Sequence, residues 1–347
     1  MVELWFGIVA VMLTMYVVMD GFDLGAGMLH LFVARTNEER RQVLSAIGPY
    51  WDANEVWLLA TGGALFVAFP KVLAAGLSGF YFAIFLVLWS LILRGIGIEF
   101  RSHVGSPMWR ALWDSVFAVA SILLGIFFGC ALGNLLRGLP LGPTGWFHLA
   151  LFTDFSARMP VGILDWYTVL VGVYALLALA MHGGTYLSWK TDGPVQARSR
   201  ACASRIAWIV AGLWPVMTFL TVRMNPDMFG QFAHRPLAWA CAAIAVAGLT
   251  TVVRALRRGA DRAAFFGSTA FLLGLMAATA ASVFPVMLRS IDVAPSLTAL
   301  NAGNDTDGLT TALRWWLVGI PLVVVYFAIQ FRVHAGKAVA AREGEGY

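Results

Sequence analysis

The chain has 347 residues, of which 60% are hydrophobic and only 12% are charged, and its formal net charge at pH 7 is +5. Soluble globular proteins carry about 25% charged residues, so this composition excludes an ordinary soluble protein and predicts an integral membrane protein. No basic run accompanies the positive charge, so basic membrane loops explain it better than a nucleic-acid surface, and no nucleic acid is expected as a partner. The three cysteines, Cys130, Cys202 and Cys241, lie far apart without a CxxC pair, which indicates neither a zinc site nor a disulfide framework.

Nine segments are long and apolar enough to cross a membrane as helices, each of which needs about 20 mostly apolar residues. Strand-like alternation of apolar and polar residues is absent from them, which excludes a membrane barrel. The sequence therefore predicts an all-α integral membrane protein with a single transmembrane domain over residues 1–347. The predicted spans are 4–33, 53–74, 76–100, 112–136, 162–187, 206–224, 236–254, 264–288 and 313–333.

Basic residues are distributed unequally between the loops that join these spans. Most of the 24 Lys and Arg residues fall after the first, third, fifth, seventh and ninth spans. Loops rich in Lys and Arg stay in the cytoplasm, so we expect the N-terminus outside and the C-terminus inside.

Ionisable side chains inside the spans are concentrated in the first half of the chain. Each is costly in hydrocarbon, by about 2.5–3.5 kcal/mol on insertion scales, and is therefore a functional hypothesis by default. They are Asp20 and Asp23 in "MDGFDLGAGML", Asp52 and Glu55 in "WDANEVW", and Arg94 and Glu99 in "RGIGIEFR".

The four acids of the first two spans form pairs spaced three residues apart. Residues at i and i+3 share a helix face, so each pair can point together into the helix bundle. Two nearby carboxylates in a low dielectric rarely both ionise, which suits a group that carries protons. The same acids can instead cap helices, and Asp52 lies at a helix start, where a cap is favoured. The residues alone leave both interpretations open.

Arg94 and Glu99 are five residues apart and therefore are not ideal partners on one helix. Each is expected to pair with a group on a neighbouring helix, and the alternative is a pair that extends toward the membrane surface near the cytoplasmic end. With the predicted orientation, Asp52, Glu55 and Glu99 lie toward the cytoplasm. The first three spans therefore predict a polar access route from that side.

The six histidines do not provide an evident haem site. Only His182, in "MHGGTYL", lies well inside a span, and two membrane histidines at matched depth cannot be paired. We therefore expect no haem and no metal bound directly by this chain.

Several motifs resemble subunit II of the cytochrome bd-type quinol oxidases, the cyanide-insensitive oxidases included. They are "MDGFDLGAGML", "GPYWDANEVWLLATGGALFVAFP", "LSGFYFAIFLVLWSLILRGIGIEFR" and "GNLLRGLP", in this order, followed by "HGGTYL", "ASVFPVML" and "SLTALNAGND". The resemblance covers essentially the whole chain, and the first-half motifs are the specific ones.

The resemblance implies a fold of two four-helix bundles plus one peripheral helix. The first bundle would occupy residues 1–137, and the second bundle with the peripheral helix residues 160–335. The chain would pair with a haem-bearing subunit I in the bacterial cytoplasmic (inner) membrane, and the complex would oxidise quinol and reduce dioxygen to water. The quinol site and the haems, of b and d type or of b type alone, would belong to subunit I. The resemblance also allows a quinone or membrane lipid on this chain and a small single-helix accessory subunit.

The resemblance also assigns roles to individual residues. Asp52 and Glu99 match acids that line a cytoplasmic proton path, and Asp23 matches the family's "GFD" acid. Asp20, beside Asp23, and His103, at a position that is basic in some relatives, are placed on the same path. Trp57 matches a tryptophan near an apolar dioxygen channel. Glu55 and Arg94 are interpreted as structural charges.

A proton-coupled secondary transporter is the alternative, because intramembrane acids suit it equally well. Transporters of that kind usually contain inverted repeats with broken helices in both halves. The confinement of charge to one half of this chain counts against it. A purely structural partner that assembles a haem subunit is a third interpretation.

Overall fold

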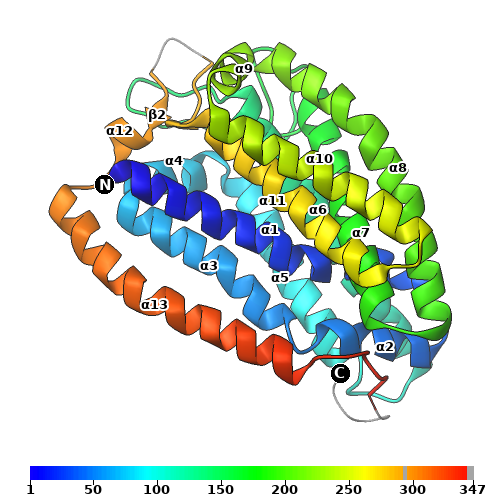
Figure 1. Cartoon of the computed structure of the whole chain (residues 1–347). Helices are drawn as coiled ribbons and strands as arrows, with labels where there is room; N and C mark the ends of the chain where they lie inside the picture. The colour runs from blue at the N-terminus through cyan, green and yellow to red at the C-terminus, as the bar shows by residue number, and fades with distance from the viewer. Residues whose placement is uncertain (292–294, 342–347) are drawn as a thin grey trace.

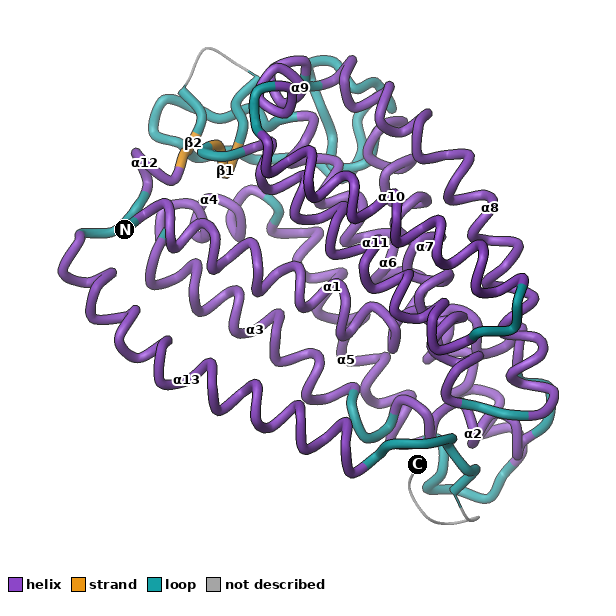
Figure 2. The backbone as a smooth tube through the Cα atoms, viewed as in Figure 1, coloured by secondary structure: helices purple, strands orange, loops and turns teal. Residues whose placement is uncertain are grey.

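The computed structural model describes residues 1–291 and 295–341, which are almost wholly helical. Figure 1 shows long helices packed side by side, and Figure 2 shows that the loops gather at the two ends of the bundle. The long helices are α1 (Val2–Val33), α3 (Trp51–Ala68), α5 (Tyr81–Phe100), α6 (Pro107–Arg137), α7 (Trp166–Lys190), α8 (Gly193–Met224), α10 (Pro236–Arg257), α11 (Asp261–Val283) and α13 (Thr306–Val333).

The shorter elements cover the ends of the bundle. α2 (Asn37–Ile47) lies at the end where α1 finishes, and the other short elements lie at the end near the N-terminus (Figure 1). The latter are α4 (Pro70–Gly79), α9 (Pro226–Ala233), α12 (Ala299–Ala302) and an antiparallel pair of strands, β1 (Val286–Leu288) and β2 (Leu297–Thr298).

Eight of the long helices, all except α3, are long and apolar enough to cross a membrane. α3 overlaps the predicted span 53–74 but has only 18 residues and carries polar side chains in its first turns. That span was predicted too long, because the helix stops at Ala68 and Pro70 begins α4. A proline has no N–H to continue a helix, and it disfavours helical geometry at the residue before it. Pro285 likewise follows α11, and the predicted span 264–288 ends at Val283.

α1 is the central helix of the bundle, and it packs against α3 and α6 on one side and α7 and α11 on the other. The contact with α7 is backbone to backbone. A Cβ atom on Gly25 would overlap the carbonyl oxygen of Leu179, and one on Gly183 would overlap the backbone of Gly25. Small residues permit this approach between membrane helices, where dispersion contacts replace the hydrophobic effect as the main attraction.

α13 differs from the other long helices in its surroundings. It runs along the outside of α3 (Figure 1), and Leu309 is its one buried residue. The described C-terminal segment then returns beneath the bundle, where Lys337 donates hydrogen bonds to the carbonyls of Trp189 and Thr191.

α2 is joined to α8 by an ion pair. Thr36 caps α2, and Glu39 completes the capping box by accepting from the Thr36 backbone N–H at 3.1 Å. Arg198 of α8 donates to both oxygens of Glu39, at 2.6 and 3.0 Å. The hydrogen bonds from Arg198 lower the pKa of Glu39 from its ordinary value of 4.5 to about 2.

We expect Gly25→Ala to destabilise the protein by about 1–3 kcal/mol, because the new methyl group must separate α1 from α7. Gly7→Ala is the matched control, since a Cβ atom there, on the same helix, meets nothing within 4 Å. Thermal unfolding in detergent measures both variants. Equal midpoints for the two would contradict the close helix contact.

The Glu39–Arg198 pair predicts a pH dependence of stability. Because the folded-state pKa of Glu39 lies below 4.5, its contribution is complete above about pH 4.5 and is lost as pH falls toward about 2. The difference in unfolding midpoint between the wild-type protein and Glu39→Gln should therefore shrink across that interval. A difference that stays constant from pH 6 to pH 3 would show that the ion pair does not contribute.

Candidate functional site

A fully buried arginine joins three helices in the first half of the bundle. Arg94 of α5 donates from Nη1 to both carboxylate oxygens of Asp20, at 2.7 and 2.8 Å, and from Nη2 to Glu55 at 2.9 Å. Asp20 lies on α1 and Glu55 on α3. Arg94 and Asp20 are both fully buried, whereas the Glu55 side chain is 24% exposed. The expected pairing of Arg94 with acids on neighbouring helices is therefore observed.

The pairing explains how a guanidinium is accommodated at this depth. A buried charge is tolerated when it is paired and hydrogen-bonded, and removal of one partner costs about 3–5 kcal/mol. Arg94 receives one carboxylate from each of two other helices, so the interaction fixes α1, α3 and α5 relative to one another.

Asp23 lies one turn beyond Asp20 and has different neighbours. Its Oδ2 accepts a hydrogen bond from Nδ2 of Asn54 at 2.8 Å, and Asn54 also donates to the carbonyl of Met19 at 3.1 Å. Asp23 is 1% exposed and Asn54 is fully buried. Among the described residues, Asp23 has no cationic partner and its Oδ1 accepts no hydrogen bond.

Other buried polar atoms lie on the same three helices. Within the described part of the chain, the Tyr16 hydroxyl, Oδ1 of Asn54, Nε of Arg94 and Nε1 of Trp57 also have no protein partner. Buried polar groups are nearly always satisfied, by protein or by ordered water. Water molecules between α1, α3 and α5 would provide the missing hydrogen bonds.

The remaining predicted proton-path residues lie on the surface. Asp52 is exposed on the first turn of α3, Glu99 is exposed on the last turn of α5, and the exposed His103 ring contacts the Glu99 carbonyl through Nδ1 at 2.8 Å. The expectation that Asp52 and Glu55 point together into the bundle is wrong. Glu55 turns inward to Arg94, which leaves Asp52 on the outer side of α3.

Trp57 packs against this chain's own peripheral helix. Its ring stacks on Phe327 of α13, with the ring centroids 5.9 Å apart, and it is 8% exposed. Trp57 is therefore covered by a helix of its own chain. Beyond Trp57, Cβ atoms on Gly62 and Gly63 would meet nothing within 4 Å, so the face of α3 that carries these two glycines is open in this chain.

A second buried ionic cluster, not predicted from the sequence, is centred on Asp114 of α6. Its carboxylate accepts from His30 Nε2 at 2.7 Å, from Arg101 Nε at 2.5 Å and from Arg40 Nη1 at 2.8 Å. Asp114 and His30 are fully buried, and Arg101 is 2% exposed. The signal that could have revealed this cluster is the place of Asp114 inside the predicted span 112–136.

A third cluster lies at the opposite end, in the "GNLLRGLP" segment. Arg137 contacts the carboxylate of Asp165, which caps α7, and donates to Asn134 Oδ1 at 2.7 Å. Asn134 in turn donates to the carbonyl of Ile163 at 2.8 Å. The cluster ties the end of α6 to the start of α7.

The two fully buried histidines, His30 and His182, are engaged in hydrogen bonds within this chain. Both ring nitrogens of His182 are engaged, Nδ1 with the Ser268 hydroxyl at 2.7 Å and Nε2 with the Val18 carbonyl at 3.0 Å. His30 uses Nε2 on Asp114. Among the described residues, no group of three or more His, Cys, Asp or Glu side chains is placed to hold a metal ion.

A cavity of about 590 Å³ lies at the end of the bundle that carries the strands. Its wall is mainly apolar, with Phe6 of α1 and Leu135 of α6 among the lining residues. Polar groups that include Asn225, Gln231 and Arg289 also line it. The lining combines an apolar wall with a few polar groups, which suits a long apolar molecule that carries a polar head.

Comparison with known proteins agrees with this architecture. The family model described as cytochrome bd terminal oxidase subunit II matches residues 1–334. The "Cytochrome bd-I ubiquinol oxidase subunit 2" of Escherichia coli K12 is 31% identical over 354 residues, covering 94% of this chain and 92% of the relative. The "Cytochrome bd ubiquinol oxidase subunit 2" of Bacillus subtilis 168 is 32% identical over 324 residues, covering 93% and 92%.

One solved structure has the same fold. The bd oxidase from Geobacillus thermodenitrificans contains a chain that superposes with a TM-score of 0.73, covering 96% of this chain and 98% of that one at 17% identity. The family match extends over the helices that form the Arg94 cluster as well as those of the second half. The chain therefore belongs to the cytochrome bd terminal oxidase subunit II family.

Proposed function

We propose that this chain is the haem-free subunit of a cytochrome bd-type quinol oxidase in the bacterial inner membrane. The family match over residues 1–334 carries this proposal. A haem-bearing subunit I would oxidise quinol and supply the haem chemistry that reduces dioxygen to water. This chain would support that subunit and bring protons toward it.

The proton role rests on the different surroundings of the three buried or half-buried acids. Asp20 and Glu55 are each bound by the Arg94 guanidinium. Asp23 is bound only by Asn54 among the described residues. One guanidinium cannot neutralise three carboxyls, so Asp23 is the group best able to gain and lose a proton.

Asp52, Glu99 and His103 supply the surface end of the proposed path. They are exposed at the starts and ends of helices on the side predicted to face the cytoplasm. Ordered water beside Asp23, Asn54 and Tyr16 would continue the path inward, since those atoms need hydrogen-bond partners. Protons would pass from the surface acids to Asp23, with the Arg94 cluster fixing the helices between which the water lies.

An access route for dioxygen beside Trp57 is a second part of the proposal. Trp57 itself is covered by Phe327, so the route would follow the open side of α3 at Gly62 and Gly63. That side is apolar, with Leu59 72% exposed and Phe66 68% exposed, and an apolar surface suits a small apolar gas.

The membrane arrangement supports the same assignment. We infer nine crossings, with α3 as the ninth, an external N-terminus and a cytoplasmic C-terminus. α1, α3, α5 and α6 would form one bundle and α7, α8, α10 and α11 the other, and the sparse contacts of α13 suit a peripheral helix. The 590 Å³ cavity would accept the quinone or lipid expected on this chain. A single-helix accessory subunit would pack against the exposed faces of these helices.

A proton-coupled transporter is not favoured. The ion pairs that link helices in the interior of the bundle join Arg94 to Asp20 and to Glu55, on α5, α1 and α3. In the second half, the described ion pairs Arg200–Asp261 and Arg289–Asp227 involve acids in the first turns of α11 and α9. An inverted repeat would place comparable charges in both halves.

We expect Asp23→Asn and Asp52→Asn each to reduce oxygen consumption by the complex by roughly tenfold or more, because a proton relay is lost. Haem absorbance should stay normal, since the Asn side chain preserves shape. Glu38→Gln is the matched control, because Glu38 is an exposed acid on α2 that is not assigned to the proposed path. If Asp23→Asn turned over at the wild-type rate across the pH range, Asp23 would not be on the path.

Asp20→Asn should instead reduce the yield of assembled complex, because it removes one carboxylate partner of the buried Arg94.

Purification from native membrane tests the partner assignment. We expect this chain to carry with it a larger haem-bearing subunit, identified by mass spectrometry and a reduced-minus-oxidised difference spectrum. The separated chain should show no haem absorbance, because its deepest histidine is fully engaged. A stoichiometric haem in the separated chain would contradict the haem-free assignment.

A further inference from the structure

A cluster of exposed arginines lies where α8, α10 and α11 meet at the α2 end of the bundle. Its members, called the arginine patch below, are Arg205, Arg254, Arg257, Arg258 and Arg262, all of them exposed. Arg258 lies in the turn between α10 and α11, which is made by Gly259 with a φ of +69°, and Arg262 lies in the first turn of α11. This conformation brings the basic end of α10 directly to the start of α11.

Cation–π contacts position two of the guanidinium groups of the patch. The Arg257 guanidinium lies 4.9 Å from the ring centroid of Trp208 on α8, and Arg205 is one turn before Trp208 on that helix. The Arg262 guanidinium lies 5.7 Å from the ring centroid of Phe266. Aromatic rings therefore hold two of the five guanidinium groups over the surface, one of them across the boundary between helices.

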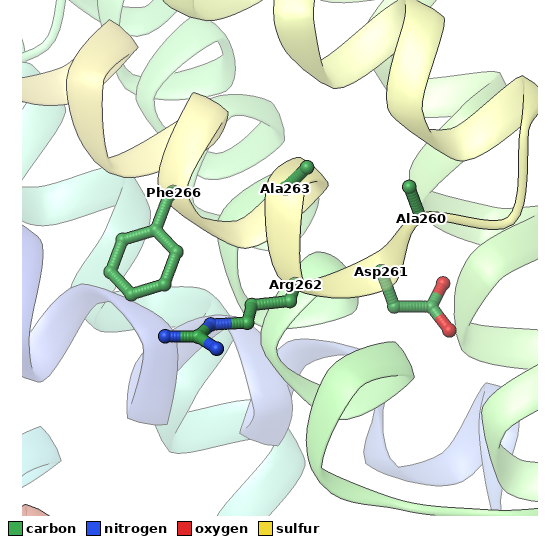
Figure 3. A pocket seen from close by; sticks show the side chains of 5 residues that line it. All are labelled: Ala260, Asp261, Arg262, Ala263 and Phe266. Carbon is green, nitrogen blue, oxygen red and sulfur yellow. The ribbon is translucent and has the colours of Figure 1, made fainter.

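Nearby acid does not neutralise the patch. Asp261 accepts from Arg200 at 2.8 and 2.5 Å and from Gln196 at 2.9 Å. In Figure 3 its carboxylate points away from Arg262 and Phe266. Within the described part of the chain, the five arginines form no ion pair. By contrast, Arg40, Arg94, Arg101 and Arg198 all have carboxylate partners.

The patch lies at the boundary of an apolar helix surface. α10 is a 22-residue membrane-spanning candidate that ends with Arg254 and Arg257. Trp208, 51% exposed, lies beside Arg257, and Phe266, 50% exposed, lies beside Arg262, as interfacial aromatic rings do. A shallow cavity of about 480 Å³, lined by Arg262, Phe266 and the residues from Ala260 to Ala263, adjoins the patch (Figure 3).

We propose that the arginine patch binds the headgroups of anionic phospholipids in the leaflet that faces this end of the protein. Clusters of four or more basic residues next to a membrane helix attract anionic lipid, and guanidinium groups bind phosphate oxygens in a fork geometry. Trp208 and Phe266 provide the adjacent contact for the first acyl carbons. Membrane topology requires basic loops, but it does not require guanidinium groups ordered by aromatic rings.

Lipid retention by the intact oxidase tests the proposal. The complex is reconstituted in nanodiscs of phosphatidylcholine with one-fifth phosphatidylglycerol, released into detergent, and analysed by native mass spectrometry for bound lipid. We expect Arg254→Gln combined with Arg257→Gln to lower phosphatidylglycerol retention about tenfold. Arg254→Lys with Arg257→Lys should retain an intermediate amount, because charge remains but the fork and the ring contact are weakened.

Arg35→Gln combined with Arg332→Gln is the matched control, since both residues are exposed at the same end and lie outside the patch. Its retention should equal that of the wild type. Equal retention by the patch variant, or an equal loss in the control, would overturn the proposal. If the Gln variant fails to assemble, a Trp208→Phe, Arg257→Lys variant must show reduced retention for the proposal to stand. Displacement of the lipid by millimolar inorganic phosphate would indicate a free-phosphate site and also overturn it.

Discussion

The burial of one arginine in a membrane protein constrains the rest of this structure. Arg94 cannot be solvated by hydrocarbon, so Asp20 and Glu55 must approach it from two other helices. α1 can offer Asp20 in one direction only if its opposite side packs tightly elsewhere, and the glycine contact with α7 provides that packing. The position of Asp23 one turn further along α1, bound to Asn54, follows from the same geometry.

The two ends of the bundle are fixed by separate polar clusters. Asp114 forms ion pairs with His30, Arg40 and Arg101 at one end, and Arg137 forms an ion pair with Asp165 at the other. Each cluster lies where helices begin or end, so it determines where the chain turns. The interior between them relies on helix contacts and on the Arg94 interaction. Polar groups thus define the ends and one internal site, and apolar packing fills the remainder.

The sequence was sufficient to predict the helical class, the approximate limits of most spans and the pairing of Arg94 with acids on neighbouring helices. It could not decide which of the two acids of α3 reaches the interior, because residues three apart on a helix share one face and periodicity does not show which of them lies nearer to Arg94. Asp52 was therefore expected inside with Glu55, and the structure turns only Glu55 toward Arg94. The Asp114 cluster was not predicted, because its partners come from three separate segments of the chain. The early end of α3 was not predicted either, because it depends on Pro70.

The exposure of α13 determines which substitutions this part of the sequence can accept. With Leu309 as its one buried residue, its 28 positions are constrained by solubility in lipid and much less by shape. Phe327 is the exception, since it covers Trp57. Related chains should therefore show rapid exchange among aliphatic residues along this helix, with an aromatic ring retained near position 327. Mutational drift there would leave the interior of the protein unaltered.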